Sequence, residues 1–596
     1  MTQYIKQRLE KMRLFMRNNN IQAFIVPSTD PHSGEYIAAH WESRKWLSGF
    51  TGSAGTIVIT LNKAGLWTDS RYFIQAELQL KDTSIQLFKE KVPETPSIPE
   101  WLVSELKSGD KVGIDPWCNS ISDIEQINST LNKKNISLQF TDNPFDTIWE
   151  DRPSIPQNKV FIHDIEFAGI SAIDKIDAIR DYLVSNNKDI LIVSALDEIC
   201  WALNLRGSDV HCNPLFISYL IISKQGAILY IDENKLDDEV KEYLLSQNIQ
   251  IRPYNSIAED LKAISHDNLK IQVPTNINGG IFDIVKKNVT IAPSPILLMK
   301  AIKNETEIEG FKKAMIRDGV AMVKFLKWLK EAVKSGKESE LSITEKVFEF
   351  RSQQQHFMGE SFGTIAGYKE NAAIVHYEAD EESNKTILPK GMLLLDSGGQ
   401  YLDGTTDITR TIILGEISEE EREDYTLVLK GMINLSMTEF PHGTCGTQLD
   451  AFARMAMWKR GMNYMHGTGH GVGHFLNVHE GPHQFRMNYM PAILVPGMTV
   501  TNEPGIYKAG KHGVRIENTM HIVKSQTTEF GDFYKLEPLT LCPIDKEGID
   551  INIMSEEEIK YLNDYHAEVY SKLSPMLSED EKEWLKKETS PIVKNI

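Results

Sequence analysis

The chain has 596 residues, which is too long for one hydrophobic core and predicts several domains. Hydrophobic residues make up 41% and charged residues 25%, as is usual for a soluble globular protein. The net charge of −19 would repel phosphates and so excludes nucleic acid as a partner.

The cysteines and the N-terminus indicate the compartment. Five cysteines are scattered without a CxxC pair, which predicts reduced thiols and no disulfide framework. Residues 1–19 are charged throughout and lack an apolar centre, which predicts an amphipathic helix and no signal peptide. Apolar runs stay well short of the 18 or so residues that cross a bilayer. We therefore expect a cytoplasmic protein that does not enter a membrane.

Two blocks of alternating helix and strand patterns open the chain. In the first, the patterns predict helices over 1–19 and 71–80 and strands over 21–28, 55–61 and 111–115. A linker at 153–156 leads to a second block of the same style. There the patterns predict helices over 170–184 and 237–247 and strands over 189–194, 215–222 and 225–231. The blocks resemble duplicated α/β units, and a second linker at 292–295 ends them.

The last block begins with a long helix. Asn304 followed by Glu307 forms a capping pattern, and a second helix is expected from Ser342. Beyond residue 545 the pattern predicts a helical tail. The long helix should turn one apolar stripe to a core, formed by Ile308, Phe311, Met315, Met322, Phe325 and Leu329.

Two predicted hairpins then carry four carboxylates. The run MLLLD ends in Asp396, and after a turn the β-branched segment TTDITRTIIL carries Asp407. MTVTNEP and VRIENTMHIV repeat this layout with Glu503 and Glu517, and GIYKAGKHG is expected as the turn between them. We expect the hairpins to be two halves of one pseudo-symmetric site.

A histidine-rich loop lies between the hairpins. It carries His470, with His466 and His479 on either side. An Asp pair in one hairpin is usually surface charge, and a lone loop histidine is usually structural. Val472 breaks a GxGxxG phosphate loop, and HExxH is absent. Together, however, four carboxylates and one imidazole suit two divalent cations that share ligands.

These motifs carry a family resemblance. The segments DSGGQYLDGTTDITRT, HGTGHGVGHFLNVHEGP and NEPGIY…GVRIEN resemble the pita-bread metallopeptidases, in particular the cytosolic eukaryotic type of Xaa-Pro aminopeptidase. GFTGSAGTIVIT and WALNLRGSDVHCNPLFISYLII resemble that family's first and middle domains. The resemblance implies an α/β and α+β multidomain fold. It comprises two creatinase-like N-terminal domains, 1–155 and 156–300, and a pita-bread catalytic domain with a helical C-terminal extension, 301–596.

The resemblance also implies a ligand set for two divalent ions, with Mn²⁺ preferred. Asp396 would chelate one ion, Asp407 and Glu517 would bridge both, and His470 and Glu503 would complete the second. A hydroxide held between ions about 3.5 Å apart would attack the scissile carbonyl, as in other two-metal aminopeptidases. Glu503 would act as the catalytic proton shuttle.

Further residues are implied around the substrate. His376, which ends a β-like run in ENAAIVHYEAD, and His479 would be catalytic, hydrogen-bonding the substrate carbonyl and its oxyanion. His466 would contact the proline side, and Arg71 and Arg515 would also bind substrate. By contrast, His474, His483 and His512 are expected to be structural or solvated.

The implied activity is release of the N-terminal residue from peptides with proline at the second position, by a homodimer. Prolidase, acting on Xaa-Pro dipeptides, is the main alternative, although it has one front domain. A methionine aminopeptidase would leave the long front half without a role. A catalytically silent peptide-binding module, or a metal-free creatinase-like hydrolase, would be expected to lack some of the five ligands.

Overall fold

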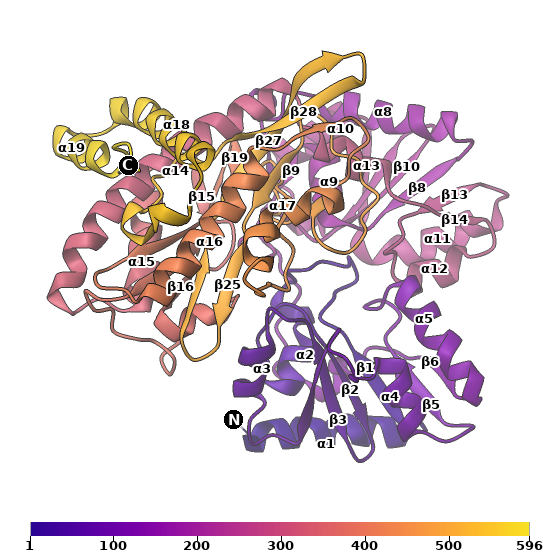
Figure 1. Ribbon diagram of the computed structural model, residues 1–596. Coiled ribbons are helices and arrows are strands. Elements are labelled where there is room, and N and C mark those ends of the chain that lie inside the picture. The colour runs from indigo at the N-terminus through magenta and orange to yellow at the C-terminus, as the bar shows by residue number, and fades with distance from the viewer. Residues whose placement is uncertain (1, 595–596) are drawn as a thin grey trace. The chain divides into compact units, whose positions relative to one another are not determined.

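The computed structural model describes residues 2–594. It forms two compact units, each with its own core (Figure 1). The first unit ends at Ile296, and Asp164–Gly169 belong to the second unit together with Leu297 onward.

The first unit begins with a six-stranded mixed sheet in the order β4-β3-β2-β1-β5-β6. Helix α1 (Thr2–Asn18) packs on it through Ile5, Leu9, Met12 and Met16, whose spacing places them on one helical face. The strands are β1 (Ala23–Val26), β2 (Thr56–Thr60), β3 (Ala64–Thr68), β4 (Ile85–Lys89), β5 (Lys111–Ile114) and β6 (Ser137–Phe140). The other helices are α2 (Ser43–Ser48), α3 (Phe73–Gln79), α4 (Ile98–Glu105), α5 (Ile121–Leu131) and α6 (Phe145–Ile148).

A second six-stranded sheet repeats this topology. Its order is β12-β11-β10-β8-β13-β14, and every neighbouring pair runs in the same sense as its counterpart in the first sheet. The expected duplication of an α/β unit is therefore confirmed. The strands are β8 (Ile190–Val193), β10 (Tyr219–Ser223), β11 (Ala227–Ile231), β12 (Ile249–Pro253), β13 (Ile271–Val273) and β14 (Val289–Ile291), and β7 (Phe161–Ile162) pairs with β9 (Leu205–Arg206). The helices are α8 (Ala172–Ser185), α9 (Leu196–Leu203), α10 (Asp238–Ser246), α11 (Ile257–His266) and α12 (Gly279–Val285).

The second unit is built on α14 (Glu305–Ala332). The Asn304 side chain accepts from the Glu307 backbone, and Glu307 caps Asn304 in return, so the predicted capping box is confirmed. Of the predicted apolar stripe, all but the half-buried Ile308 are fully buried. The other helices are α7 (Ile165–Ala168), α13 (Pro295–Ala301), α15 (Glu340–Ser352), α16 (Glu419–Ser436), α17 (Gly446–Trp458), α18 (Glu556–Leu573) and α19 (Glu579–Glu588).

Two nested hairpins form the centre of this unit. Strand β17 (Met392–Ser397) pairs antiparallel with β20 (Ile408–Ile413), and β24 (Thr499–Asn502) pairs likewise with β27 (Asn518–Thr528). Each outer pair encloses a smaller hairpin. The first contains β18 (Gly399–Tyr401) and β19 (Gly404–Thr405), and the second contains β25 (Gly505–Lys508) and β26 (His512–Arg515). The shared layout agrees with the predicted pseudo-symmetry.

The remaining strands extend these sheets. Sheet orders are β15-β18-β19, β16-β17-β20 and β21-β28-β27-β24-β22-β23. The added strands are β15 (Phe357–Glu360), β16 (Ile365–Tyr368), β21 (Glu439–Pro441), β22 (Gly469–Gly471), β23 (Glu480–Phe485) and β28 (Gly531–Pro538).

Three local predictions were wrong. The segment around 505–513, predicted as a turn, is the β25–β26 hairpin, because Ile506 pairs opposite Val514 and both are buried. The run before His376, predicted as β-like, forms the short 3₁₀ helix η6 (Lys369–Ala373) and a turn. Helix α15 starts at Glu340, two residues early, because Ser339 and not a later residue caps it.

Other predictions hold in the part of the chain that is described. The helical tail is present as α18 and α19. All five cysteines are free thiols. Among residues 2–594, no helix is both long enough and apolar enough to cross a membrane.

Candidate metal centre

The two nested hairpins bring the predicted ligands together. Ligand atoms of Asp407, His470 and Glu517 all lie within 4.8 Å of one another. The His470 Nε2 atom is 3.5 Å from a carboxylate oxygen of Asp407 and 3.5 Å from one of Glu503. Residues more than a hundred positions apart thus converge on one point.

The position of Asp396 is set by Arg515. The Arg515 Nε and Nη2 atoms donate to Asp396 Oδ2 at 3.0 and 2.6 Å. The guanidinium also donates to the hydroxyl of Tyr507 at 2.8 Å, and the residue is 1% exposed. Arg515, expected to bind substrate, is thus engaged by Asp396 and Tyr507.

His470 is held in the orientation that a metal ligand requires. Its Nδ1 lies 2.9 Å from the carbonyl of Gly471, so this nitrogen donates and Nε2 keeps its lone pair toward the carboxylates. Its backbone N–H donates to Thr501, a β24 residue, at 3.0 Å.

The carboxylates repel one another in a buried setting. Burial, followed by the charges of neighbouring carboxylates, raises the pKa of Asp407 well above its ordinary value. The same causes, in the same order, raise the pKa of Glu503 and of Glu517. One buried arginine cannot balance four carboxylates, so the centre requires further positive charge.

Two buried oxygen atoms test whether cations fit. Asp396 Oδ1 and Glu517 Oε1 are fully buried and accept no hydrogen bond, although the second oxygen of each is bonded to Arg515 and Thr409 respectively. A buried carboxylate oxygen without a donor is strongly destabilising unless a cation meets it. Carboxylates and one imidazole therefore fit two divalent ions well.

The histidine loop borders this group. The ring centroids of His470 and His479 are 4.3 Å apart. His466 lies close by, and its Nε2 is 2.8 Å from the Tyr507 hydroxyl. Because Tyr507 in turn contacts Arg515, a hydrogen-bonded chain runs from His466 to Asp396.

The other predicted substrate residues lie on separate elements. His376 is half-buried and follows η6. The η6 helix packs against β16, β17, β25 and β26, of which β17 carries Asp396 and β26 carries Arg515. Arg71 belongs to the first unit, where it forks onto Asp69 at 2.9 and 2.8 Å and contacts Glu35 at 3.3 Å. These contacts hold the Arg71 side chain within its own domain.

His474, His483 and His512 are buried structural residues and none is solvated. His483 binds the Thr499 carbonyl at 2.7 Å, and burial lowers the pKa of His483 to about 4. His512 lies 2.7 Å from Asp424 on α16.

Sequence reasoning missed the groups that hold the ligands in place. Thr409 and Tyr507 were not singled out, yet they bond Glu517 and the Arg515 guanidinium. Thr409 lies two residues beyond Asp407, and this spacing was a usable signal. Tyr507 lay in the segment predicted as a turn, where side-chain direction could not be inferred.

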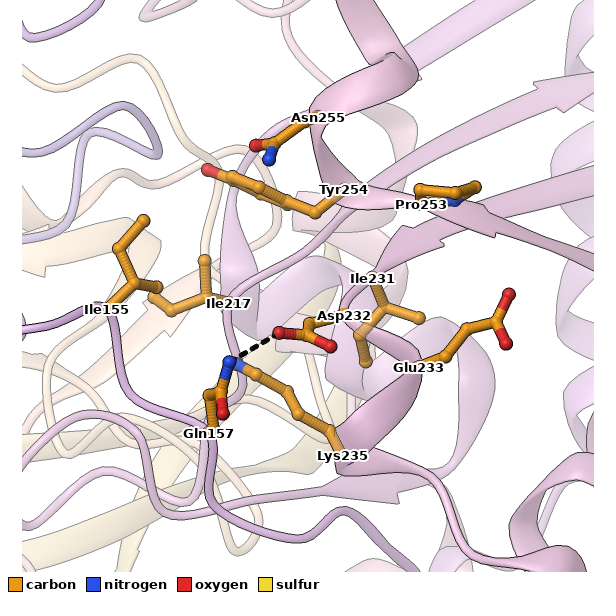
Figure 2. Close-up of a pocket in the computed structure, with 10 residues that line it drawn as sticks. All are labelled: Ile155, Gln157, Ile217, Ile231, Asp232, Glu233, Lys235, Pro253, Tyr254 and Asn255. Carbon is orange, nitrogen blue, oxygen red and sulfur yellow. Dashed lines mark hydrogen bonds between the residues drawn. The ribbon is translucent and has the colours of Figure 1, made fainter.

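A separate cavity lies in the first unit (Figure 2). It has a volume of about 480 Å³ at the carboxyl ends of β11 and β12, between Ile217, Asp232 and Tyr254. Gln157 donates to Asp232 at 2.7 Å across it. None of the predicted ligands or substrate residues lines this cavity.

The nested hairpins bring four carboxylates close to one histidine, and two of the carboxylate oxygens are buried without a hydrogen-bond donor. This arrangement defines a metallohydrolase of the two-cation type. Family models agree with this class. The creatinase/prolidase N-terminal domain matches residues 8–147 and again 151–307, metallopeptidase family M24 matches 309–524, and the C-terminal region of that peptidase matches 532–592.

Similar proteins narrow the class further. A probable Xaa-Pro aminopeptidase P of Laccaria bicolor is 42% identical over 98% of this chain and 93% of its own length. Xaa-Pro aminopeptidase 1 of Dictyostelium discoideum is 42% identical over 99% and 97%. The crystal structure of an X-prolyl aminopeptidase from Caenorhabditis elegans, described as a cytosolic enzyme with a di-nuclear active site, matches with TM-score 0.95 and 34% identity over 99% of this chain and 100% of that one. The chain therefore belongs to metallopeptidase family M24, within the Xaa-Pro aminopeptidases.

Proposed function

We propose that this protein is a metal-dependent aminopeptidase that releases the N-terminal residue from peptides with proline at the second position. The observation that carries the proposal is the convergence of Asp407, His470 and Glu517, with Glu503 3.5 Å from His470 and with buried oxygens of Asp396 and Glu517 left for cations. The match to X-prolyl aminopeptidases over nearly the whole chain supports the substrate class.

The ligand roles are those that the family resemblance implies. Asp396, held by Arg515, would serve one ion, Asp407 and Glu517 would be shared, and His470 with Glu503 would serve the other. Two divalent ions supply a nucleophilic water at neutral pH and polarise the scissile carbonyl, as in other two-metal aminopeptidases. The oxygen-rich set with a single imidazole favours Mn²⁺.

The chain's own residues then move protons and bind charge. Glu503, the most accessible of the carboxylates, takes the proton from the nucleophile and delivers it to the leaving proline nitrogen. His376 and His479 donate to the substrate carbonyl as negative charge develops on its oxygen. His466, polarised by Tyr507, contacts the proline side of the substrate. Because Arg515 is engaged by Asp396, its contribution to substrate binding is through the orientation of that ligand.

Proline specificity has a chemical basis. A bond to proline nitrogen has no N–H, and the ring fixes φ. A site that does not grip that N–H and is filled by the ring therefore prefers proline to other residues.

Arg71 is proposed to bind substrate carbonyls or a carboxylate from the first domain. Kinetics of Arg71→Ala on peptides of increasing length test this role. A rise in KM that grows with length is expected, and unchanged kinetics would leave Arg71 as the partner of Asp69 alone.

A homodimer is proposed as the assembled form, acting on peptides from a cytoplasmic location. Exposed apolar residues gather on α17 and the loops after it, and such patches are typical of association surfaces. They are Phe452, Met455, Trp458, Met465, Met487 and Tyr489. The cytosolic description of the C. elegans enzyme and the free cysteines support the compartment.

The substrate class is tested by kcat/KM on a matched series of Xaa-Pro, Xaa-Pro-Yaa, a longer Xaa-Pro peptide, and Xaa-Ala-Yaa. The tripeptide and longer peptide should be cleaved fastest, the dipeptide more slowly, and the alanine peptide slowest. A clear preference for the dipeptide would instead indicate a prolidase, and equal rates for alanine and proline would remove proline specificity.

A further inference from the structure

The residue that follows each proposed oxyanion histidine is buried, and its side chain bonds to a helix or to the segment beside one. Tyr377 follows His376 and is 4% exposed, and Glu480 follows His479 and is 2% exposed. Neither residue has a role in the proposed chemistry. The Glu480 side chain bonds to Lys300 on α13 and to Lys303 in the segment after that helix. The Tyr377 side chain bonds to Glu340 on α15.

Glu480 is held by two lysines. Lys300 Nζ donates to Glu480 Oε2 at 2.7 Å, and Lys303 Nζ donates to Oε1. All three side chains are about 1% exposed. Lys300 lies in α13, and Lys303 lies in the short segment before α14, where its backbone N–H also donates to the Gly497 carbonyl at 2.9 Å.

A buried ion pair of this kind contributes little to stability by itself. Desolvation of three charges offsets most of their attraction, so a gain in stability does not by itself account for this group. Glu480 is the first residue of β23 and pairs in register with Gly471, the residue after His470. Fixing Glu480 therefore fixes the point at which the chain passes His479 beside His470.

Tyr377 is held by a carboxylate that has no ion-pair partner among residues 2–594. Its hydroxyl donates to Glu340 Oε2 at 2.8 Å, and Glu340, the first residue of α15, is 0% exposed. Glu340 also accepts from the backbone N–H groups of Tyr368 at 2.7 Å and Lys385 at 2.9 Å. One carboxylate thus ties together both ends and the middle of the loop that carries His376.

We propose that Glu480, with Lys300 and Lys303, is the positioning group for His479, and that Glu340, with Tyr377, is the positioning group for His376. The inference rests on the oxyanion roles given to these two histidines under the proposed function. None of the positioning groups touches substrate. Each group acts by setting the position of its histidine donor. A displacement of such a donor by about 1 Å lowers the rate of the chemical step about a hundredfold.

The test is a pair of double-mutant cycles, Glu480→Gln with His479→Ala and Tyr377→Phe with His376→Ala, in the full-length, metal-loaded enzyme. Each anchor variant should lower kcat about ten- to a hundredfold, with KM within about twofold and the metal content unchanged. In the matching histidine background the same substitution should cause no further loss. In the crossed background, such as Tyr377→Phe with His479→Ala, the losses should multiply.

Three outcomes are decisive. If an anchor substitution lowers kcat as much in its matching histidine background as in the wild type, its role is purely structural and the proposal is wrong. If the anchor variants keep wild-type kcat, the proposal is also wrong. If His376→Ala and His479→Ala themselves keep wild-type kcat, the oxyanion assignment fails instead, so the two failures are distinguishable.

Folding is controlled by two further variants. Lys303→Met combined with Glu480→Gln removes one charge of each sign, and it should behave in the cycle like Glu480→Gln. Lys303→Arg keeps the charge and should retain most of the wild-type kcat. Loss of activity in Lys303→Arg equal to that in the double variant would contradict positioning by the ion pair.

Discussion

At the scale of single residues, the proposed centre has two classes of side chain, those expected to hold cations and those expected to act on the substrate. Asp407 and Glu517 are buried and have raised pKa values, as is expected of the proposed ligands when no cation is bound. His479 lies beside His470, yet it is not one of the three residues whose ligand atoms converge. These two classes should respond differently to substitution.

The first prediction concerns His479. His479→Ala should keep both metal equivalents and lose about 10²–10³-fold in kcat, because one donor to a developing oxyanion is removed. Elemental analysis and steady-state kinetics on the same sample check this. His521→Ala is a suitable control, since His521 is on β27 with no predicted role in the reaction. Wild-type turnover in His479→Ala would make His479 a structural residue.

Sequence patterns could identify the ligands but not the residues that orient them. Asp396, Asp407, Glu503 and Glu517 follow apolar or β-branched runs, and strand pairing made their convergence predictable. The bond between Arg515 and Asp396 spans 119 positions and depends on how the hairpins meet. Sequence periodicity contains no information on that contact.

At the scale of elements, the second unit is held together by the cap at the start of α14 and by bonds from strand β20 to the helical tail. Asn304 caps α14 and also donates to the Ala168 carbonyl at 2.9 Å. Arg410, on β20, donates to the Glu517 carbonyl and to the Tyr565 hydroxyl of α18 at 3.0 Å. The helical tail is therefore bonded to the strand ends that carry the ligands.

The second prediction concerns the α14 cap. Asn304→Ala should destabilise the protein by about 1–2 kcal/mol, because it leaves backbone donors of the first turn unsatisfied. For a domain of this size the loss corresponds to a fall in Tm of roughly 2–4 °C. Differential scanning calorimetry checks it, with Ser578→Ala at the exposed start of α19 as a matched control that should change Tm less. An unchanged Tm for Asn304→Ala would show that the cap is dispensable.

Element prediction succeeded where apolar spacing is regular and failed where local chemistry decides. The start of α14 was predicted correctly, and the elements that were predicted in the two α/β units lie close to the observed ones, apart from β10, which starts four residues later than expected. The β25–β26 hairpin and η6 were missed, because both lie in short segments whose conformation is set by packing against one another. His376 lies after η6, so its place in the site could not be derived from a strand pattern.

At the scale of the whole molecule, metals and stability should be linked through pH. Burial and mutual repulsion raise the pKa values of Asp407, Glu503 and Glu517 in the metal-free protein. A carboxylate with a raised folded-state pKa stabilises the fold below its unfolded-state pKa of about 4, and this contribution is lost as pH rises through the folded-state value. Cations remove the repulsion that causes the loss.

The third prediction follows from that linkage. The difference in Tm between the Mn²⁺-loaded and metal-free protein should grow as pH rises from 5 to 8. Buried histidines such as His483 and His566, whose pKa values are lowered by burial, affect both forms equally and cancel in the difference. In the metal-free protein, Glu517→Gln should make Tm fall less steeply as pH rises, since it removes one of the repelling charges. A difference in Tm that does not vary with pH would contradict the electrostatic account.

The most direct test of the central claim is metal stoichiometry measured together with peptidase activity. The wild-type protein, freed of metal and titrated with Mn²⁺, should bind two ions per chain and cleave an Xaa-Pro-Yaa peptide in proportion to their loading. Asp407→Asn, which removes a ligand shared by both ions, should bind fewer than two and be inactive while keeping its fold. Two full equivalents in active Asp407→Asn, or wild-type activity without bound metal, would contradict the two-cation centre.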